Sequence, residues 1–181
     1  AGEDEQTAYK FTNGAFVEDT ELKPGDYAKR QYYGVDGQIG LSSVLGMTSL
    51  RGEYLWGTQP GAAGDSKSPT GAIASDMYVR KFNGYYLQFV QDIATSKHSL
   101  VLKYDAYDPN TKVSNNECQT KGDIAYSTFG IGWLFRANQN LRVMCYYDIN
   151  SNEKVNNDVV DAKYNKNLSD DVFTLRLQYK F

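Results

Sequence analysis

The sequence lacks the features that define several large classes of protein. Its mean hydropathy is −0.57, and its apolar runs are only a few residues long, whereas a transmembrane helix needs about 20 apolar residues. Helical membrane spans are therefore excluded. The 181 residues include 19 Lys and Arg against 22 Asp and Glu. Because the chain has no excess of basic residues, binding to nucleic acid is not expected.

Cysteine and histidine are also scarce. Cys118 lies in a polar stretch and Cys145 in an alternating one, so we expect two free thiols rather than a disulfide. His98 lies in an expected turn with no serine–acid partnership, so we expect no enzyme. Residues 148–159 begin like a calcium loop, but Glu153 stands where glycine is needed. No metal or cofactor is therefore expected.

The first residues have neither the basic region nor the apolar core of a signal peptide. We therefore expect a mature chain, a processed chain or a fragment. Its length suits one domain or a piece of a larger one. Residues 1–30 are expected to be mostly loop, with a first strand over residues 8–16.

Aromatic residues are abundant for so polar a chain: 15 Tyr, 8 Phe and 2 Trp. Apolar residues recur with a period of two, which predicts β-strands. The expected strands are about residues 31–42, 47–57, 78–93, 99–107, 124–137, 141–150 and 171–181. They are longer than the five or six residues of an average strand and match the length of a tilted membrane-crossing strand.

The links between these strands alternate in length. Residues 42–46, 94–98 and 138–140 are short turns, whereas residues 58–76, 108–123 and 151–170 are long and polar. This alternation is typical of outer-membrane barrels, which have short periplasmic turns and long extracellular loops. It predicts an all-β, antiparallel, up-and-down transmembrane barrel.

The two faces of each expected strand differ in content. Charges keep to one face, and the other is apolar, with aromatic rings near its ends, as membrane interfaces favour. In the last strand the apolar face comprises Phe173, Leu175, Leu177, Tyr179 and Phe181. A Lys or Arg facing lipid at mid-bilayer would cost roughly 2–4 kcal/mol, so we interpret the apolar faces as lipid-facing.

The charged faces are expected to line the lumen. Their members are Arg51, Lys103, Arg142, Arg176, Lys180, Asp36, Glu53, Asp105 and Asp148. Nearly equal numbers of each sign give no strong selectivity, and cross-strand ion pairs are the favoured role. Arg142, Arg176 and Lys103 are the residues expected to contact permeating anions.

Three stretches resemble a known family. The terminus, residues 173–181, is similar to the C-terminal strand of bacterial outer-membrane proteins, whose terminal Phe is read by the barrel-assembly machinery. Residues 84–88 (GYYLQ) and 100–110 (LVLKYDAYDPN) resemble the phosphate-selective (polyphosphate) porin family, especially its Bacteroidetes members. The resemblance covers residues 31–181, the C-terminal part of such barrels.

Membership would imply a sixteen-stranded trimeric porin in the Gram-negative outer membrane that passes small anions. The family's constriction loop and phosphate-selecting residues lie in an N-terminal half with no counterpart here, so phosphate selectivity transfers to no residue. Two alternatives remain open. One is a small closed barrel with a structural or adhesion role, and the other is a soluble ligand-binding barrel.

Overall fold

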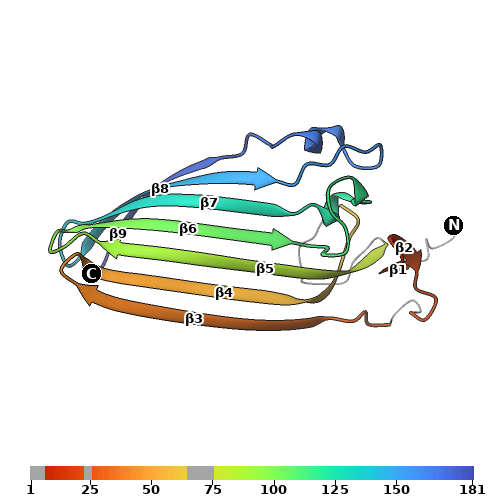
Figure 1. Cartoon of the computed structure of the whole chain (residues 1–181), viewed down its shortest axis with the longest axis horizontal. Coiled ribbons are helices and arrows are strands. Elements are labelled where there is room, and N and C mark those ends of the chain that lie inside the picture. Colours follow the sequence, from red (N-terminus) through yellow and green to blue (C-terminus); the bar gives the residue numbers. More distant parts are fainter. Residues whose placement is uncertain (1–6, 23–25, 65–75) are drawn as a thin grey trace.

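The computed structural model describes residues 7–22, 26–64 and 76–181, and these form one β-sheet (Figure 1). The strands are β1 (Ala8–Thr12), β2 (Ala15–Glu18), β3 (Gln31–Ser43), β4 (Gly46–Gly61), β5 (Met77–Asp92), β6 (His98–Asp108), β7 (Tyr126–Arg136), β8 (Leu141–Asn152) and β9 (Val172–Tyr179). The links contain 3₁₀ turns η1 (Asn115–Glu117), η2 (Lys121–Asp123) and η3 (Ala162–Asn165). No helix in the described ranges is long and apolar enough to cross a membrane.

Strands β3 to β9 form an antiparallel meander in which each strand pairs with its neighbours in sequence. The all-β class and the seven expected strands are confirmed. The largest difference is at β4, which continues to Gly61 because its last residues still pair with the start of β5. The seven strands therefore form one continuous wall.

This wall is not closed in the described part of the chain. β3 and β9 are its two edges, and every residue of β3 is exposed. Six antiparallel steps separate these edges, so β3 and β9 run in the same direction. An up-and-down barrel that contains this wall therefore requires an odd number of additional strands.

Residues 8–16 do not extend either edge. They form most of a hairpin, β1–β2, whose turn uses Asn13 (φ 53°) and Gly14 (φ 85°). Asn-Gly suits this turn because both central positions need positive φ. β1 pairs in parallel with the first residues of β5, beyond the end of β6. The expected first strand is present, but it lies at the loop end of the wall.

The two ends of the wall differ (Figure 1). At one end the strands are joined by tight turns. The β3–β4 turn ends at Gly46, whose φ is 106° and where a Cβ would lie 2.2 Å from the Asp92 carbonyl oxygen, so only glycine fits. The chain's C-terminus lies at this turn end, and the long links lie at the other, the loop end.

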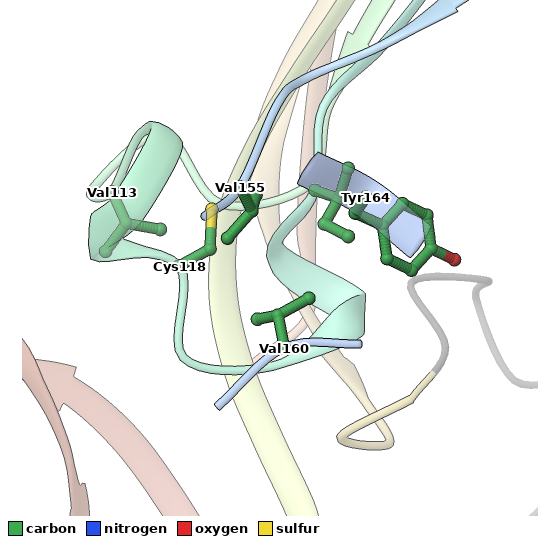
Figure 2. Close-up of a cluster of buried hydrophobic side chains, with 6 residues drawn as sticks. Val113, Cys118, Val155, Val160 and Tyr164 are labelled. Atoms are coloured by element: carbon green, nitrogen blue, oxygen red, sulfur yellow. The ribbon is translucent and has the colours of Figure 1, made fainter. Parts of the chain in front are cut away.

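The cap at the loop end, which we call the loop-end cap, consists of the β1–β2 hairpin (residues 8–18) and two of the long links. These are the second link (residues 109–125), which follows β6, and the third link (residues 153–171), which follows β8. Its buried core is shown in part in Figure 2 and consists of Val113, Cys118, Ile124, Val155, Val160 and Tyr164. Phe11 of the hairpin and Leu168 pack against it. The principal apolar core of the described chain thus lies in its loops.

Candidate functional site

The strand register joins the apolar faces of all seven strands into one surface, which we call the outer face. One row across it runs from β3 to β9 through Ile39, Leu50, Phe89, Leu102, Ile131, Tyr147 and Phe173. The apolar face of each strand follows from the alternation in that strand's own sequence. The register places all seven apolar faces on the same side of the sheet.

Within the described ranges, no layer of protein packs on the outer face. Val35 on β3 is 62% exposed, Leu87 on β5 52% and Leu177 on β9 69%. Exposed apolar patches on soluble monomers rarely exceed a few hundred Å², whereas this one extends over seven long strands. The outer face therefore requires an apolar environment.

Each strand of the wall has one aromatic residue nearest the loop end of its outer face. From β3 to β9 these are Tyr33, Trp56, Tyr85, Tyr104, Phe129, Tyr147 and Phe173. They do not lie in one hydrogen-bonded row. Tyr33 and Trp56 share the row of Asn83, whereas Tyr147 and Phe173 share the row of Phe89. The aromatic line is oblique to the rows.

The slope of this aromatic line gives a strand tilt. The line shifts by six residues along β5 over the six steps from β3 to β9. Six residues span about 20 Å along a strand, and six inter-strand steps span about 29 Å, which gives about 35°. Strands that tilt by about 35–45° to a barrel axis would place all seven rings at one height.

A second group of rings lies at the turn end of the outer face. Trp133 and Phe135 stack with centroids 5.8 Å apart, and His98 stacks on both. The Trp133 Nε1 donates a hydrogen bond to His98 Nδ1 over 3.1 Å. His98 is the first residue of β6 rather than part of the turn, so its expected position is wrong by one element, and its ring belongs to this aromatic cluster.

The opposite surface, the inner face, holds the charged residues expected to line a lumen. Glu53 and Asp105 flank Tyr86 in one row, and Arg51 and Lys103 flank Gln88 in the next. Lys103 forms an ion pair with Asp105 along its own strand. The Arg51 and Lys103 cations lie 5.7 and 5.8 Å from the Tyr86 ring centroid. Side chains from β4, β5 and β6 thus form one interacting group.

Arg142, Arg176 and Lys180 lie apart from that group, near the turn end. Arg142 pairs with Gln178, and Arg176 pairs with Met144, so the two arginines are diagonal neighbours. Lys103 lies nearer the middle of the wall. The three residues expected to contact anions therefore do not form one site. Asp36 and Asp148 lie on the inner face, opposite Glu53 and Gly130.

One ion pair on the inner face involves residues that were not singled out in the sequence. Arg136 Nη2 lies 3.0 Å from Asp92 Oδ1, and Ser99 joins both through hydrogen bonds. Asp92 and Arg136 come from β5 and β7, on either side of β6. This pair spans two strand steps and is joined by a serine that only the register reveals. Among the residues expected to line the lumen, the ion pair found in the described ranges, Lys103–Asp105, lies along a single strand rather than across strands.

A buried polar cluster fixes the cap to the wall. Arg80 of β5 donates a hydrogen bond from Nε to Asp123 Oδ1 over 2.9 Å. Both side chains are buried, with 1% of Arg80 and 0% of Asp123 exposed. The other nitrogens of Arg80 donate to the Ala62 carbonyl and Thr120 Oγ1. The guanidinium also lies over the rings of Phe16 and Tyr78. One arginine therefore joins β5, the second link and the hairpin.

The thiols are in different environments. Cys118 is 1% exposed in the cap core, and its Sγ donates to Glu153 Oε2. Burial, followed by the nearby Glu153 carboxylate, raises the pKa of Cys118 to about 12, so the thiol stays neutral. Cys145 lies on β8 facing the outer surface, paired with Trp133. Both cysteines are free.

The described residues contain no cluster of three or more His, Cys, Asp or Glu arranged to hold a metal ion. Comparisons with protein-family models, with curated proteins and with solved structures give no match to this chain. The functional argument therefore depends on the two faces of the wall.

Proposed function

We propose that this chain forms wall strands of a transmembrane β-barrel in the bacterial outer membrane and acts as a porin, or as the C-terminal part of one. Small hydrophilic solutes would diffuse passively along the inner face. The observation that carries this proposal is the oblique line of seven outer-face aromatics, because its slope equals the tilt of barrel strands.

The distribution of charge supports the same assignment. Between the aromatic line and the turn end, the described strands have no Lys, Arg, Asp or Glu on the outer face. The inner face has charges of both signs throughout its length. A soluble barrel with an apolar interior would need these two faces exchanged. A barrel with a water-filled interior and a lipid exterior suits both the charged inner face and the apolar outer face.

The direction of the edge strands constrains the complete barrel. Two copies related by rotation about a barrel axis would bring β9 of one beside β3 of the other, and those strands are parallel. An antiparallel barrel instead needs an odd number of further strands between β9 and β3. One further strand would give eight, but the hairpin of residues 8–18 does not supply it, because β1 pairs with the start of β5 rather than with β3 or β9. The described residues therefore do not make a closed eight-stranded barrel by themselves, and we favour a larger pore.

The resemblance to the phosphate-selective porin family adds further parts to the proposal. The barrel-assembly machinery would read Phe173, Leu175, Leu177 and Tyr179 on the outer face of the edge strand β9, together with Phe181 just after it. Outer-membrane lipid would cover the outer face, and the assembly would be a homotrimer. Small anions such as phosphate would be among the solutes, and Arg142, Arg176 and Lys103 are the residues that would contact them.

Reconstitution tests the proposal in two steps. The chain is folded into detergent and then into lipid vesicles, and its migration on detergent gels is compared with and without heating. Heat-modifiable migration and protection of strands β3–β9 from protease are expected for a membrane barrel. A water-soluble, fully protease-accessible protein would contradict membrane residence.

Planar-bilayer conductance then tests the pore. Stepwise current is expected from a porin, whereas a membrane-inserted protein without conductance would favour the structural or adhesion alternative. Neutralising Arg142, Arg176 and Lys103 together should reduce any anion preference. Unchanged conductance and ion selectivity in that triple variant would exclude these residues from the permeation path.

A further inference from the structure

The inner face has a depression between β4, β5 and β6 that the charge pattern alone does not explain. Its volume is about 260 Å³, and its lining includes Glu53, Leu55, Gly84, Tyr86, Lys103, Asp105 and Tyr107. It exists because Gly84 lies between Leu55 and Tyr107 in one row of the inner face. A Cβ at Gly84 would come within 3.3 Å of the Tyr107 ring, so any side chain there would start to fill the space.

The aromatic walls of the depression are held in place by polar contacts. Arg51 and Lys103 lie over the Tyr86 ring from the strands on either side. The Tyr107 hydroxyl accepts a 2.6 Å hydrogen bond from Gln59 Nε2. Two phenol rings and the Leu55 side chain thus form a preorganised apolar surface. Binding sites commonly combine such a surface with a few fixed polar groups.

The polar groups at the rim are mainly acceptors. Glu53 and Asp105 lie in the row of Tyr86, and Lys103 is paired with Asp105. Carboxylates only accept hydrogen bonds, and an ammonium only donates them. A phosphate or other anion would meet two carboxylates here. A ligand with several hydroxyl donors, some ether or hydroxyl acceptors and an apolar face would satisfy every group.

From this chemistry we infer that the depression is a subsite for one ring of a neutral pyranose sugar. The C–H face of the sugar packs on Tyr86 and Leu55, its hydroxyls donate to Glu53 and Asp105, and Lys103 donates to a sugar oxygen. The volume is just below the roughly 300 Å³ of the smallest drug-sized sites, which suits a single ring. This inference rests on the proposed porin function, because it names a solute that the pore would pass.

Saturation-transfer NMR on the full chain, folded in detergent, tests the subsite with methyl α-glucoside as the probe. We expect transfer to the ring protons and weak binding, with a Kd on the order of 1 mM. Tyr86→Ala should weaken binding about tenfold through loss of the stacking surface. Glu53→Gln keeps the shape and should also weaken it, because one amide donor replaces an acceptor.

Matched controls lie on β8 of the inner face. Tyr146→Ala removes a ring that covers Gly130 and Gly132, and Asp148→Asn removes a carboxylate, both outside the depression. Neither control should change binding of the probe. Heat-modifiable migration of every variant verifies that it is folded, and Glu53→Gln keeps the test decisive if Tyr86→Ala does not fold.

The inference is overturned if the folded wild type shows no saturation transfer, or if Tyr86→Ala and Glu53→Gln both bind as well as the controls. Competition by inorganic phosphate would make the depression an anion site, and tighter binding of choline would make it a cation site; either result also overturns the inference. If the protein binds the sugar but fails to enter vesicles, the subsite is supported and the porin function is contradicted. If the protein conducts but does not bind the sugar, the porin function is supported and the subsite is contradicted.

Discussion

The loop-end cap and the seven-stranded wall bury their apolar residues in opposite ways. In the cap, Ile124 is 0% exposed and Val155 1%, as in the core of a water-soluble domain. In the wall, Ile39 is 60% exposed and Leu175 61%. The two regions belong to one chain, and β1 of the cap pairs with β5 of the wall at their boundary. Under the proposed function, the difference reflects the solvent that each region meets.

This contrast extends to charge. The cap encloses an ion pair, Arg80–Asp123, whose carboxylate accepts further hydrogen bonds from Asn110, Gln119 and Thr120. Between the aromatic line and the turn end, the charges of the described wall strands lie on the inner face, and the pair Lys103–Asp105 there is half-exposed. A loop that faces water can bury a paired charge, whereas a face that meets lipid has to exclude one.

The largest expected effect comes from breaking the buried pair in the cap. Arg80→Met leaves the Asp123 carboxylate buried without its cation, a change that costs about 3–5 kcal/mol in proteins. Because Arg80 joins the hairpin, the second link and β5, the cap should open and be cleaved at least about 100-fold faster by protease. Cleavage rates in residues 109–125 measure this.

Arg51→Met is the matched control, because Arg51 is an exposed arginine of the neighbouring strand β4. It should change the cleavage rate little, since exposed cation–π contacts contribute about 0.5–1 kcal/mol. The wall should keep heat-modifiable migration in both variants. Equal cleavage of Arg80→Met and the wild type would show that the cap does not depend on this pair.

The next largest effect should appear when a charge is placed on the outer face. Ile131→Arg puts a guanidinium at the middle of β7, where lipid contact would cost roughly 2–4 kcal/mol. Thr128→Arg is the control on the inner face of the same strand, opposite Asp105. Unfolding by denaturant in lipid vesicles measures both. Equal destabilisation of the two variants would mean that neither face of the wall meets lipid.

Much of the wall could be predicted from sequence because its signal is local. A period of two in segments such as Phe173–Phe181 predicts the strand, its apolar face and the face on which its charged residues lie. The tilt could not be predicted in this way. It depends on how Trp56 lines up with Asn83, and Phe129 with Leu87, and such registers follow from turn lengths and pairing rather than from any one segment.

The cap and the inner-face depression were hidden for a different reason. Arg80, Asp123 and Asn110 are spread over polar links whose composition resembles solvated loop, and no periodicity connects them. The depression needs Gly84 placed between Leu55 and Tyr107 on neighbouring strands. One available signal was missed: Asn13-Gly14 between two apolar runs predicts the β1–β2 hairpin.

A smaller effect should separate the two kinds of burial directly. Ile124→Val removes one methylene from the cap core and should cost about 0.5–1.5 kcal/mol. Ile131→Val removes the same group from the outer face, where lipid chains refill the space, and should cost less than about 0.5 kcal/mol. Protease susceptibility of the cap measures the effect of Ile124→Val, and denaturant unfolding of the wall measures the effect of Ile131→Val. A larger loss for Ile131→Val would imply that protein, not lipid, packs on the outer face.

The smallest effect concerns the ionisation of Cys118 near pH 9. Burial raises the pKa of Cys118 to about 12 from an ordinary value of 9.0, so the folded cap retains a proton that the unfolded chain releases. The resulting stability is fully present below pH 9 and is lost as pH rises from there toward 12. We expect protease susceptibility of the cap to increase with pH from about 9 in the wild type and to increase less in Cys118→Ala.

Labelling with a water-soluble maleimide tests the burial of the same thiol. The reagent should label Cys118 at pH 8 only after the cap is opened. Prompt labelling of the folded protein would contradict the burial of this thiol, and with it the distinction between a dry cap and a lipid-covered wall.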